Sequence, residues 1–187
     1  MYRRLCLLWL SCVCVNLLHA QSSGDRYEIF GGYSLVTNDF TGIQFDNQRH
    51  LMNGWSTAFT YKPIPLFGIT ADVSGYHASS SNSLSAHSLN FLFGPTLSLP
   101  LSRVTPFAHI LFGPVHVSYP NGCRQCSGTN AFSYALGGGA DFFFTKHIGV
   151  RGQVDFFHNG ISSLDNQLDS PYHQNTARIT TGLVVPF

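Results

Sequence analysis

The sequence predicts an all-β chain in which eight strands close into one antiparallel, up-and-down barrel. Three observations predict this fold. Apolar and polar residues alternate with a period of two in eight separate segments. The connections between these segments alternate between short and long. Only 10% of the 187 residues are charged, against 44% hydrophobic, whereas a typical soluble domain has about 25% charged residues. We therefore expect the outside of the barrel to face lipid, as in a transmembrane β-barrel.

The composition also excludes several protein classes. An aromatic content of 14% with few charges excludes a disordered chain. A formal net charge of +1 provides no basic surface for nucleic acid. Beyond the N-terminus, no run approaches the ~20 apolar residues of a spanning helix, which excludes a polytopic helical membrane protein.

Residues 1–20 have the pattern of a cleavable signal peptide. Arg3 and Arg4 form a positive start, an apolar stretch follows, and Ala20 supplies a small residue at the expected cleavage point. The apolar stretch is shorter than the ~20 residues of a membrane span. We therefore expect export, with a mature barrel domain over residues 21–187.

The expected cleavage leaves two cysteines, Cys123 and Cys126, in the third long connection. Two cysteines in an exported chain predict a disulfide. A redox motif would need a helix N-terminus to lower the thiol pKa, and a zinc site would need two more ligands; the sequence shows neither. A lipoprotein anchored through Cys12 is the weaker alternative, because Trp9 stands where an aliphatic residue is preferred.

The eight expected strands have the alternation of half-buried β-structure, and no segment shows the 3.6-residue apolar period of a helix. They cover residues 26–37, 52–62, 66–77, 87–99, 104–119, 131–144, 147–157 and 175–187. Connections after the second, fourth and sixth strands are tight. The other four are longer and polar, near 38–51, 78–86, 120–130 and 158–174. Outer-membrane barrels have this arrangement, with the long loops outside the cell.

Each strand has one apolar face and one face of polar or small residues. In segment 147–157, for example, Val150 and Val154 oppose Arg151 and Asp155. Segment 104–119 is the exception, because its two histidines fall on opposite faces, so its inward side is not assigned. Aromatic residues near strand ends predict girdles at the two membrane interfaces: Tyr27, Trp55, Tyr61, Phe67, Phe107, Tyr119, Phe144 and Phe187.

Charged residues on the polar faces are expected to point into the barrel: Glu28, Lys62, Asp72, Asp141, Arg151, Asp155 and Arg178. The last three strands bring four of them close enough to pair, and we expect a lumen charge cluster of Asp141, Arg151, Asp155 and Arg178. Charges at this depth must be paired to be tolerated. Eight strands enclose only enough space for side chains, so we expect a packed plug, with an ion path or gate as the alternative.

Several segments resemble small outer-membrane β-barrel proteins and are similar to the transmembrane domain of outer membrane protein A. They include YEIFGGYS (27–34), LFGITADVSGYH (66–77), FSYALGGGADFFFTKHIGVRGQVDFF (132–157) and RITTGLVVPF (178–187). The resemblance implies a location in the cell outer membrane of a Gram-negative-type bacterium. It also implies a C-terminal aromatic residue that the barrel assembly machinery reads, and Phe187 with Val185 and Leu183 matches that signal.

No catalytic, metal or cofactor site is expected. His77 and Ser79 resemble the His-x-Ser pair of eight-stranded lipid A deacylases, but such a pair needs an acid to orient the histidine. The only glutamate, Glu28, falls at the other end of the barrel. The histidines beyond the signal segment have no spacing typical of metal ligands.

We expect a monomer with a non-enzymatic structural or surface-interaction role carried by the long loops, where rigid scaffolds commonly carry function. The expected partners are outer-membrane lipid, lipopolysaccharide and, during biogenesis, the barrel assembly machinery; the sequence does not identify an extracellular partner. A narrow pore for small solutes or ions is one alternative. An outer-membrane lipid-modifying enzyme is the other.

Overall fold

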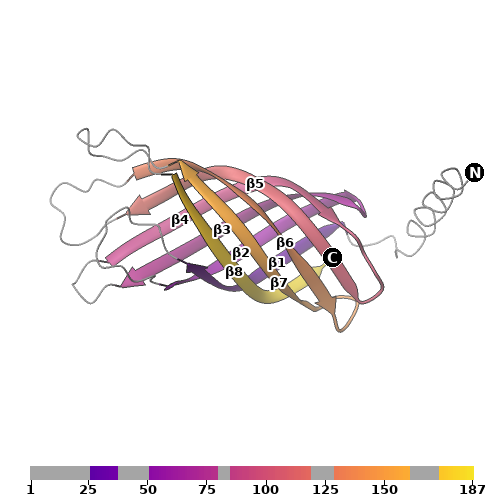
Figure 1. Ribbon diagram of the computed structural model, residues 1–187. Coiled ribbons are helices and arrows are strands. Elements are labelled where there is room, and N and C mark those ends of the chain that lie inside the picture. The colour runs from indigo at the N-terminus through magenta and orange to yellow at the C-terminus, as the bar shows by residue number, and fades with distance from the viewer. Residues whose placement is uncertain (1–25, 38–50, 80–84, 119–128, 161–172) are drawn as a thin grey trace, which may run out of the picture.

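The computed structural model describes residues 26–37, 51–79, 85–118, 129–160 and 173–187, which form eight strands. They are β1 (Tyr27–Thr37), β2 (Leu51–Ile64), β3 (Phe67–Ser79), β4 (Ser85–Ser98), β5 (Val104–Ser118), β6 (Thr129–Phe143), β7 (Gly149–Gly160) and β8 (His173–Pro186). Each strand pairs antiparallel with the next, and β1 pairs with β8 to close the barrel (Figure 1). The predicted eight-stranded barrel is confirmed, with strand ends within a few residues of those expected. Within the described ranges, no helix is long and apolar enough to cross a membrane.

The connections are sorted between the two ends of the barrel. Three tight connections lie at the end that also holds the C-terminus, which we call the turn end (Figure 1). One is closed by two hydrogen bonds between Leu101 and Val104, with Ser102 in the left-handed region at a φ of 51°. At the loop end, β1 meets β2 at Thr37 and Leu51. The other four connections leave from this end, and their residues, 38–50, 80–84, 119–128 and 161–172, lie outside the described ranges. The expectation of a long connection near 78–86 is wrong, because the paired strands β3 and β4 extend to Ser79 and Ser85 and leave five residues between them.

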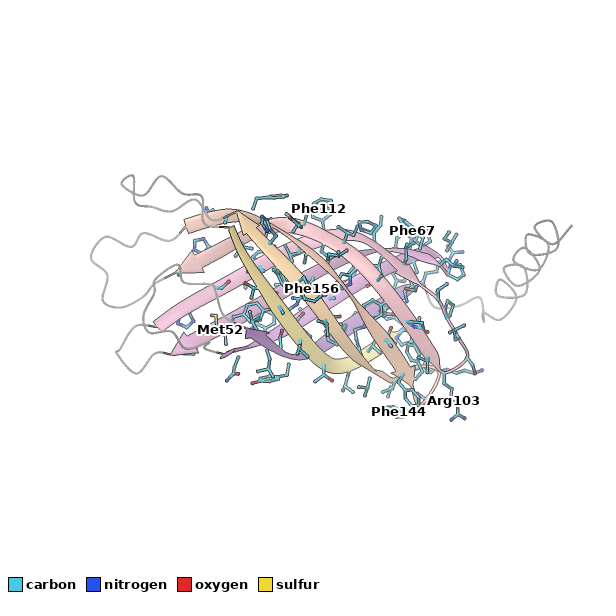
Figure 2. All side chains as sticks on the ribbon, in the orientation of Figure 1. Met52, Phe67, Arg103, Phe112, Phe144 and Phe156 are labelled. Carbon is cyan, nitrogen blue, oxygen red and sulfur yellow. The ribbon has the colours of Figure 1, made fainter. Side chains whose placement is uncertain are left out.

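Large hydrophobic side chains cover the outside of all eight strands. Ile110, Leu136, Phe156 and Leu183 keep more than half of their surface exposed, and Figure 2 shows Phe112 projecting from the outer side of the wall. Soluble monomers rarely expose apolar patches larger than a few hundred Å². An outside that is apolar all round suits hydrocarbon, so the fold is that of a transmembrane barrel.

Aromatic rings cluster on the outside of the turn end. The Tyr27 ring stacks on Phe59, Tyr61 and Phe187, with centroids 6.0, 5.3 and 5.8 Å apart. Two backbone hydrogen bonds join Tyr27 and Phe187, at 3.0 and 2.9 Å. The first and last strands therefore close at a patch of aromatic rings that includes two amphipathic tyrosines, the residue type expected at a membrane interface.

The structure assigns the faces of β5. His109 and Leu111 are buried inside the barrel, whereas His116 is exposed on the outside. The prediction that Phe107 belongs to an aromatic girdle is wrong. This residue lies on the same inward face as His109 and is 8% exposed, because side chains two residues apart share one face of a strand.

Candidate functional site in the barrel lumen

Polar side chains line the lumen, and every strand contributes at least one that is buried. Within the described residues, Thr176 Oγ1 is the one buried side-chain oxygen or nitrogen without a hydrogen-bond partner. The charged lumen side chains form two networks at different levels, which we call the turn-end network and the central network.

The turn-end network joins Glu28, Lys62, Asp141 and Arg151. The Arg151 guanidinium donates to both oxygens of Asp141, from Nε at 2.6 Å and from Nη2 at 2.7 Å. Arg151 Nη2 also donates to Glu28 Oε1 across the lumen, and Lys62 Nζ donates to Glu28 Oε2 at 2.8 Å. Two carboxylates therefore meet two cations, and the network is neutral.

Two lumen aromatic rings hold the guanidinium of Arg151 in place. Its Cζ lies 4.4 Å from the ring centroid of Phe107 and 5.2 Å from that of Phe30, both within the ~6 Å range of a cation–π contact. Phe30 is itself 1% exposed. The rings exclude water from one side of the ion pairs and so keep Arg151 turned toward its carboxylate partners.

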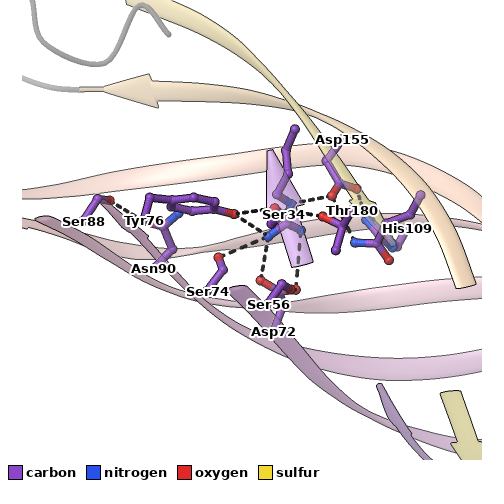
Figure 3. Close-up of polar contacts among 12 residues, drawn as sticks. Ser34, Ser56, Asp72, Ser74, Tyr76, Ser88, Asn90, His109, Asp155 and Thr180 are labelled. Carbon is purple, nitrogen blue, oxygen red and sulfur yellow. Dashed lines mark hydrogen bonds and ion pairs between the residues drawn. The ribbon is translucent and has the colours of Figure 1, made fainter. Parts of the chain in front are cut away.

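The central network is built around Arg178, whose side chain has no exposed surface. Its Nε donates to Asp155 Oδ2 at 2.6 Å, and its Nη1 donates to Asp72 Oδ1 at 3.0 Å. Nη1 also lies 3.1 Å from Ser74 Oγ and 3.2 Å from Tyr76 Oη. Asp72, Ser74 and Tyr76 all come from β3, which does not pair with β8, and Figure 3 shows their dashed contacts meeting at one point of the lumen. The Arg178 Cζ lies 4.8 Å from the ring centroid of Phe157, which packs against the guanidinium.

Further donors satisfy the two central carboxylates. Ser56 Oγ donates to Asp72 Oδ2 at 2.8 Å, and Gln153 Nε2 donates to Asp155 Oδ2 at 3.1 Å. His109 Nε2 lies 2.7 Å from Asp155 Oδ1, and because an ionised carboxylate only accepts, this nitrogen is the donor. The network thus ties β2, β3, β5, β7 and β8 together through the middle of the lumen.

Buried apolar side chains also line the lumen. Two clusters, each made of residues that are 4% exposed or less, lie in the middle of the barrel and toward the loop end: Leu92, Leu111, Ala135 and Phe157, and Val36, Met52, Tyr76 and Val115. The second cluster adjoins the central network, because Leu92 is opposite Asp72 in the strand register and Phe157 packs against Arg178.

The four residues of the predicted lumen charge cluster all face inward, but they divide between the two networks. Asp141 pairs with Arg151, and Asp155 pairs with Arg178. Arg151 and Asp155 are four residues apart on β7, which corresponds to about 13 Å of extended strand. The sequence also placed Glu28, Lys62 and Asp72 inside, without assigning their partners. It missed His109, because nothing in the sequence fixed the inward side of β5.

The remaining predicted sites lie on the outside of the barrel or outside the described residues. Cys123 and Cys126 are among the residues not described. His77 is exposed near the loop end, and its ring contacts His87; the one acid on its own strand, Asp72, is buried on the opposite, inward face. In the described ranges, no group of three or more histidine, cysteine, aspartate or glutamate residues could hold a metal. Leu183, Val185 and Phe187 all have exposed side chains on the outside of the turn end.

No protein-family model matches this chain, and no curated protein matches it by sequence. Solved structures match it by fold. Neisserial surface protein A superposes with a TM-score of 0.66 at 10% identity, over 86% of this chain and 97% of its own. The outer membrane protein OprG from Pseudomonas aeruginosa superposes with a TM-score of 0.55 at 10% identity, over 88% of this chain and 96% of its own. A third match is Ail, the attachment invasion locus protein of Yersinia pestis, in complex with the heparin analogue sucrose octasulfate. It superposes with a TM-score of 0.54 at 13% identity, over 84% of this chain and 97% of its own. The fold is therefore that of the small outer-membrane barrels, as the sequence resemblance implied.

Proposed function

We propose that the protein is an integral outer-membrane barrel that does not conduct ions, and that the four connections at its loop end carry a non-enzymatic structural or surface-interaction role. One observation carries the proposal: the lumen is crossed by two satisfied ion-pair networks, with Arg178 and Asp155 each 0% exposed. An eight-stranded barrel has room for side chains or one small ligand and not for an aqueous channel. The lumen residues thus stabilise the barrel wall, and the connections at the loop end are the part available for interaction.

The apolar outside supports placement in a bilayer, with membrane lipid and lipopolysaccharide as the surrounding partners. The barrel assembly machinery is the proposed partner during biogenesis. In support, Leu183 and Val185 present apolar side chains to the outside, and Phe187 stacks on Tyr27 at the closing seam.

The composition of the four connections indicates which chemical class of partner fits the loop end. They are rich in serine and asparagine and contain two arginines, Arg49 and Arg124, against four aspartates, Asp39, Asp46, Asp165 and Asp169. A surface with this charge balance does not attract polyanions. A heparin analogue of the kind bound to Ail is therefore not the expected ligand here. An uncharged glycan or a protein surface fits better, with the expected Cys123–Cys126 disulfide tightening the third connection.

Planar-bilayer recording of refolded residues 21–187 tests the closed lumen. We expect no conductance steps from the wild-type protein. Arg151→Ala is expected to weaken the fold without opening a regular channel, because the removed side chain belongs to a packed wall. Uniform steps from the wild-type protein, with a changed amplitude in Arg151→Ala, would overturn the closed lumen and favour the narrow pore.

Loop shortening separates the two roles. A variant with residues 38–50 and 161–172 replaced by short Gly-Ser linkers is expected to keep the heat-modifiable gel shift of a folded barrel. At matched expression in a Gram-negative host, we expect it to lose adhesion to surfaces or cells while detergent resistance of the envelope is unchanged. Loss of detergent resistance with adhesion intact would instead assign the purely structural role.

A further inference from the structure

Two histidines face each other on the outside of the barrel near the loop end. His77 of β3 and His87 of β4 are directly opposite in the strand register. Both side chains are exposed. Their ring centroids are 4.5 Å apart with an interplanar angle of 39°, and the two Nδ1 atoms lie 3.3 Å apart. The pair therefore brings two imidazole nitrogens to one point on a rigid sheet.

This nitrogen separation is the one that a tetrahedral metal requires. With metal–nitrogen bonds of 2.0–2.1 Å and a tetrahedral angle, two ligating imidazole nitrogens lie about 3.3 Å apart. Imidazole is also a preferred ligand of zinc, copper and nickel. We propose that His77 and His87 bind one divalent transition-metal ion, of which Zn²⁺ is the reference case, through their Nδ1 atoms.

Among the described residues, the site has two protein ligands, and water would complete the coordination. No third histidine, cysteine, aspartate or glutamate joins the pair among the described residues. The flanking strands present Asn53 opposite His77 and Ser118 opposite His87. Neither flanking residue carries a positive charge that would repel a cation.

Binding changes the tautomer of one ring and needs no other reactant. Without metal, an Nδ1–Nδ1 hydrogen bond between neutral imidazoles requires one ring to carry its proton on Nδ1 and the other to accept there. With metal, both Nδ1 lone pairs are donated to the ion, and the displaced proton of the donor ring is carried on Nε2. No net proton is released from two neutral rings.

Metal binding would clamp β3 to β4 at the loop end. Because a ligand that binds only the folded state stabilises it by mass action, the clamp would strengthen the outer part of this hairpin. The sequence did not indicate the site, since ten residues separate the two histidines and only the register of β3 against β4 brings them together.

Zn²⁺ binding to metal-stripped, untagged residues 21–187 in detergent micelles tests the proposal, with a chromophoric chelator as competitor. We expect one Zn²⁺ per barrel in the wild type and at least a tenfold loss of affinity in His77→Ala and in His87→Ala. His116→Ala is the matched control and is expected to bind as the wild type. This histidine is also exposed on the outside, but its Nδ1 lies 2.7 Å from Asn130 Oδ1 and not from a second imidazole.

An equal loss in the control, or no loss in either test variant, would place the metal elsewhere and overturn the proposal. The heat-modifiable gel shift establishes that each variant is folded. Imidazole ¹⁵N NMR of the wild type gives a readout without any substitution. On addition of Zn²⁺, we expect the Nδ1 resonances of two histidines to shift together, and unchanged Nδ1 resonances at saturating Zn²⁺ would also refute the site.

Discussion

The substitution Arg178→Met removes the cation at the centre of the barrel and keeps much of its length. It leaves Asp155 and Asp72, previously 2.6 and 3.0 Å from the guanidinium, as two buried carboxylates near each other. Removing one partner of a buried ion pair typically costs 3–5 kcal/mol, because the other charge is left uncompensated. We therefore expect Arg178→Met to lower the free energy of unfolding by about 4 kcal/mol, close to a thousandfold in the folding equilibrium at ~1.4 kcal/mol per tenfold.

Urea titration of the barrel refolded into phospholipid vesicles measures this change. Trp55 is the only tryptophan in residues 21–187 and lies on the outside, half exposed to lipid, so its emission reports the loss of the membrane-inserted state. The matched control is Arg103→Met, at an exposed position in a tight turn. A surface substitution there should change the free energy of unfolding by no more than about 0.5 kcal/mol.

A triple variant tests the cause. Adding Asp72→Asn and Asp155→Asn to Arg178→Met removes the stranded charges, and replacing a complete buried ion set with neutral residues is often nearly neutral in stability. We expect the triple variant to recover at least half of the loss. If the free energy of unfolding of Arg178→Met lies within about 1 kcal/mol of the wild-type value, the central network is hydrated. That result would refute the reasoning that the lumen is a dry plug.

Two glycine substitutions probe the wall itself. A Cβ at Gly137 would meet the Asp155 carboxylate, so Gly137→Ala should lower the free energy of unfolding by about 1–3 kcal/mol in the same urea titration, as overpacking does. The control is Gly152→Ala, because nothing lies within 4 Å of a Cβ at that position. This variant should be almost as stable as the wild type. A Cβ at Gly75 would lie 2.8 Å from Nε1 of Trp55, so Gly75→Ala should displace this ring and shift its emission maximum in the folded barrel. Unchanged emission together with unchanged stability would contradict the close packing of that ring.

The fold could be predicted from the sequence because a barrel wall depends on local pattern. Val150, Arg151 and Val154 already show which side of β7 meets lipid, since alternate side chains of a strand point to opposite faces. The alternation of short and long connections predicted which connections lie together at each end of the barrel. Neither inference needs the position of any strand relative to a distant one.

The lumen could be predicted only in part. Asp141 and Arg151 are opposite each other across one tight turn, so their pairing follows from a single hairpin. The contact of Arg151 with Glu28 depends on closure of the whole barrel. The inward face of β5 was not predictable, because its inward residues Phe107 and Leu111 are as apolar as its outward ones: an apolar layer inside the lumen removes the contrast that alternation relies on.

The cross-lumen ion pairs have a consequence for how the chain enters a membrane. Arg151 and Glu28 are 123 residues apart in the chain, and Arg178 and Asp72 are 106 apart. Before β1 meets β8, an incomplete sheet in lipid would present these arginines without partners, alongside unpaired strand edges, and both are costly in hydrocarbon. Half-built barrels are therefore unfavourable inside the bilayer. Insertion and ring closure should occur as a single concerted event, with the slow kinetics of contacts between distant parts of the chain.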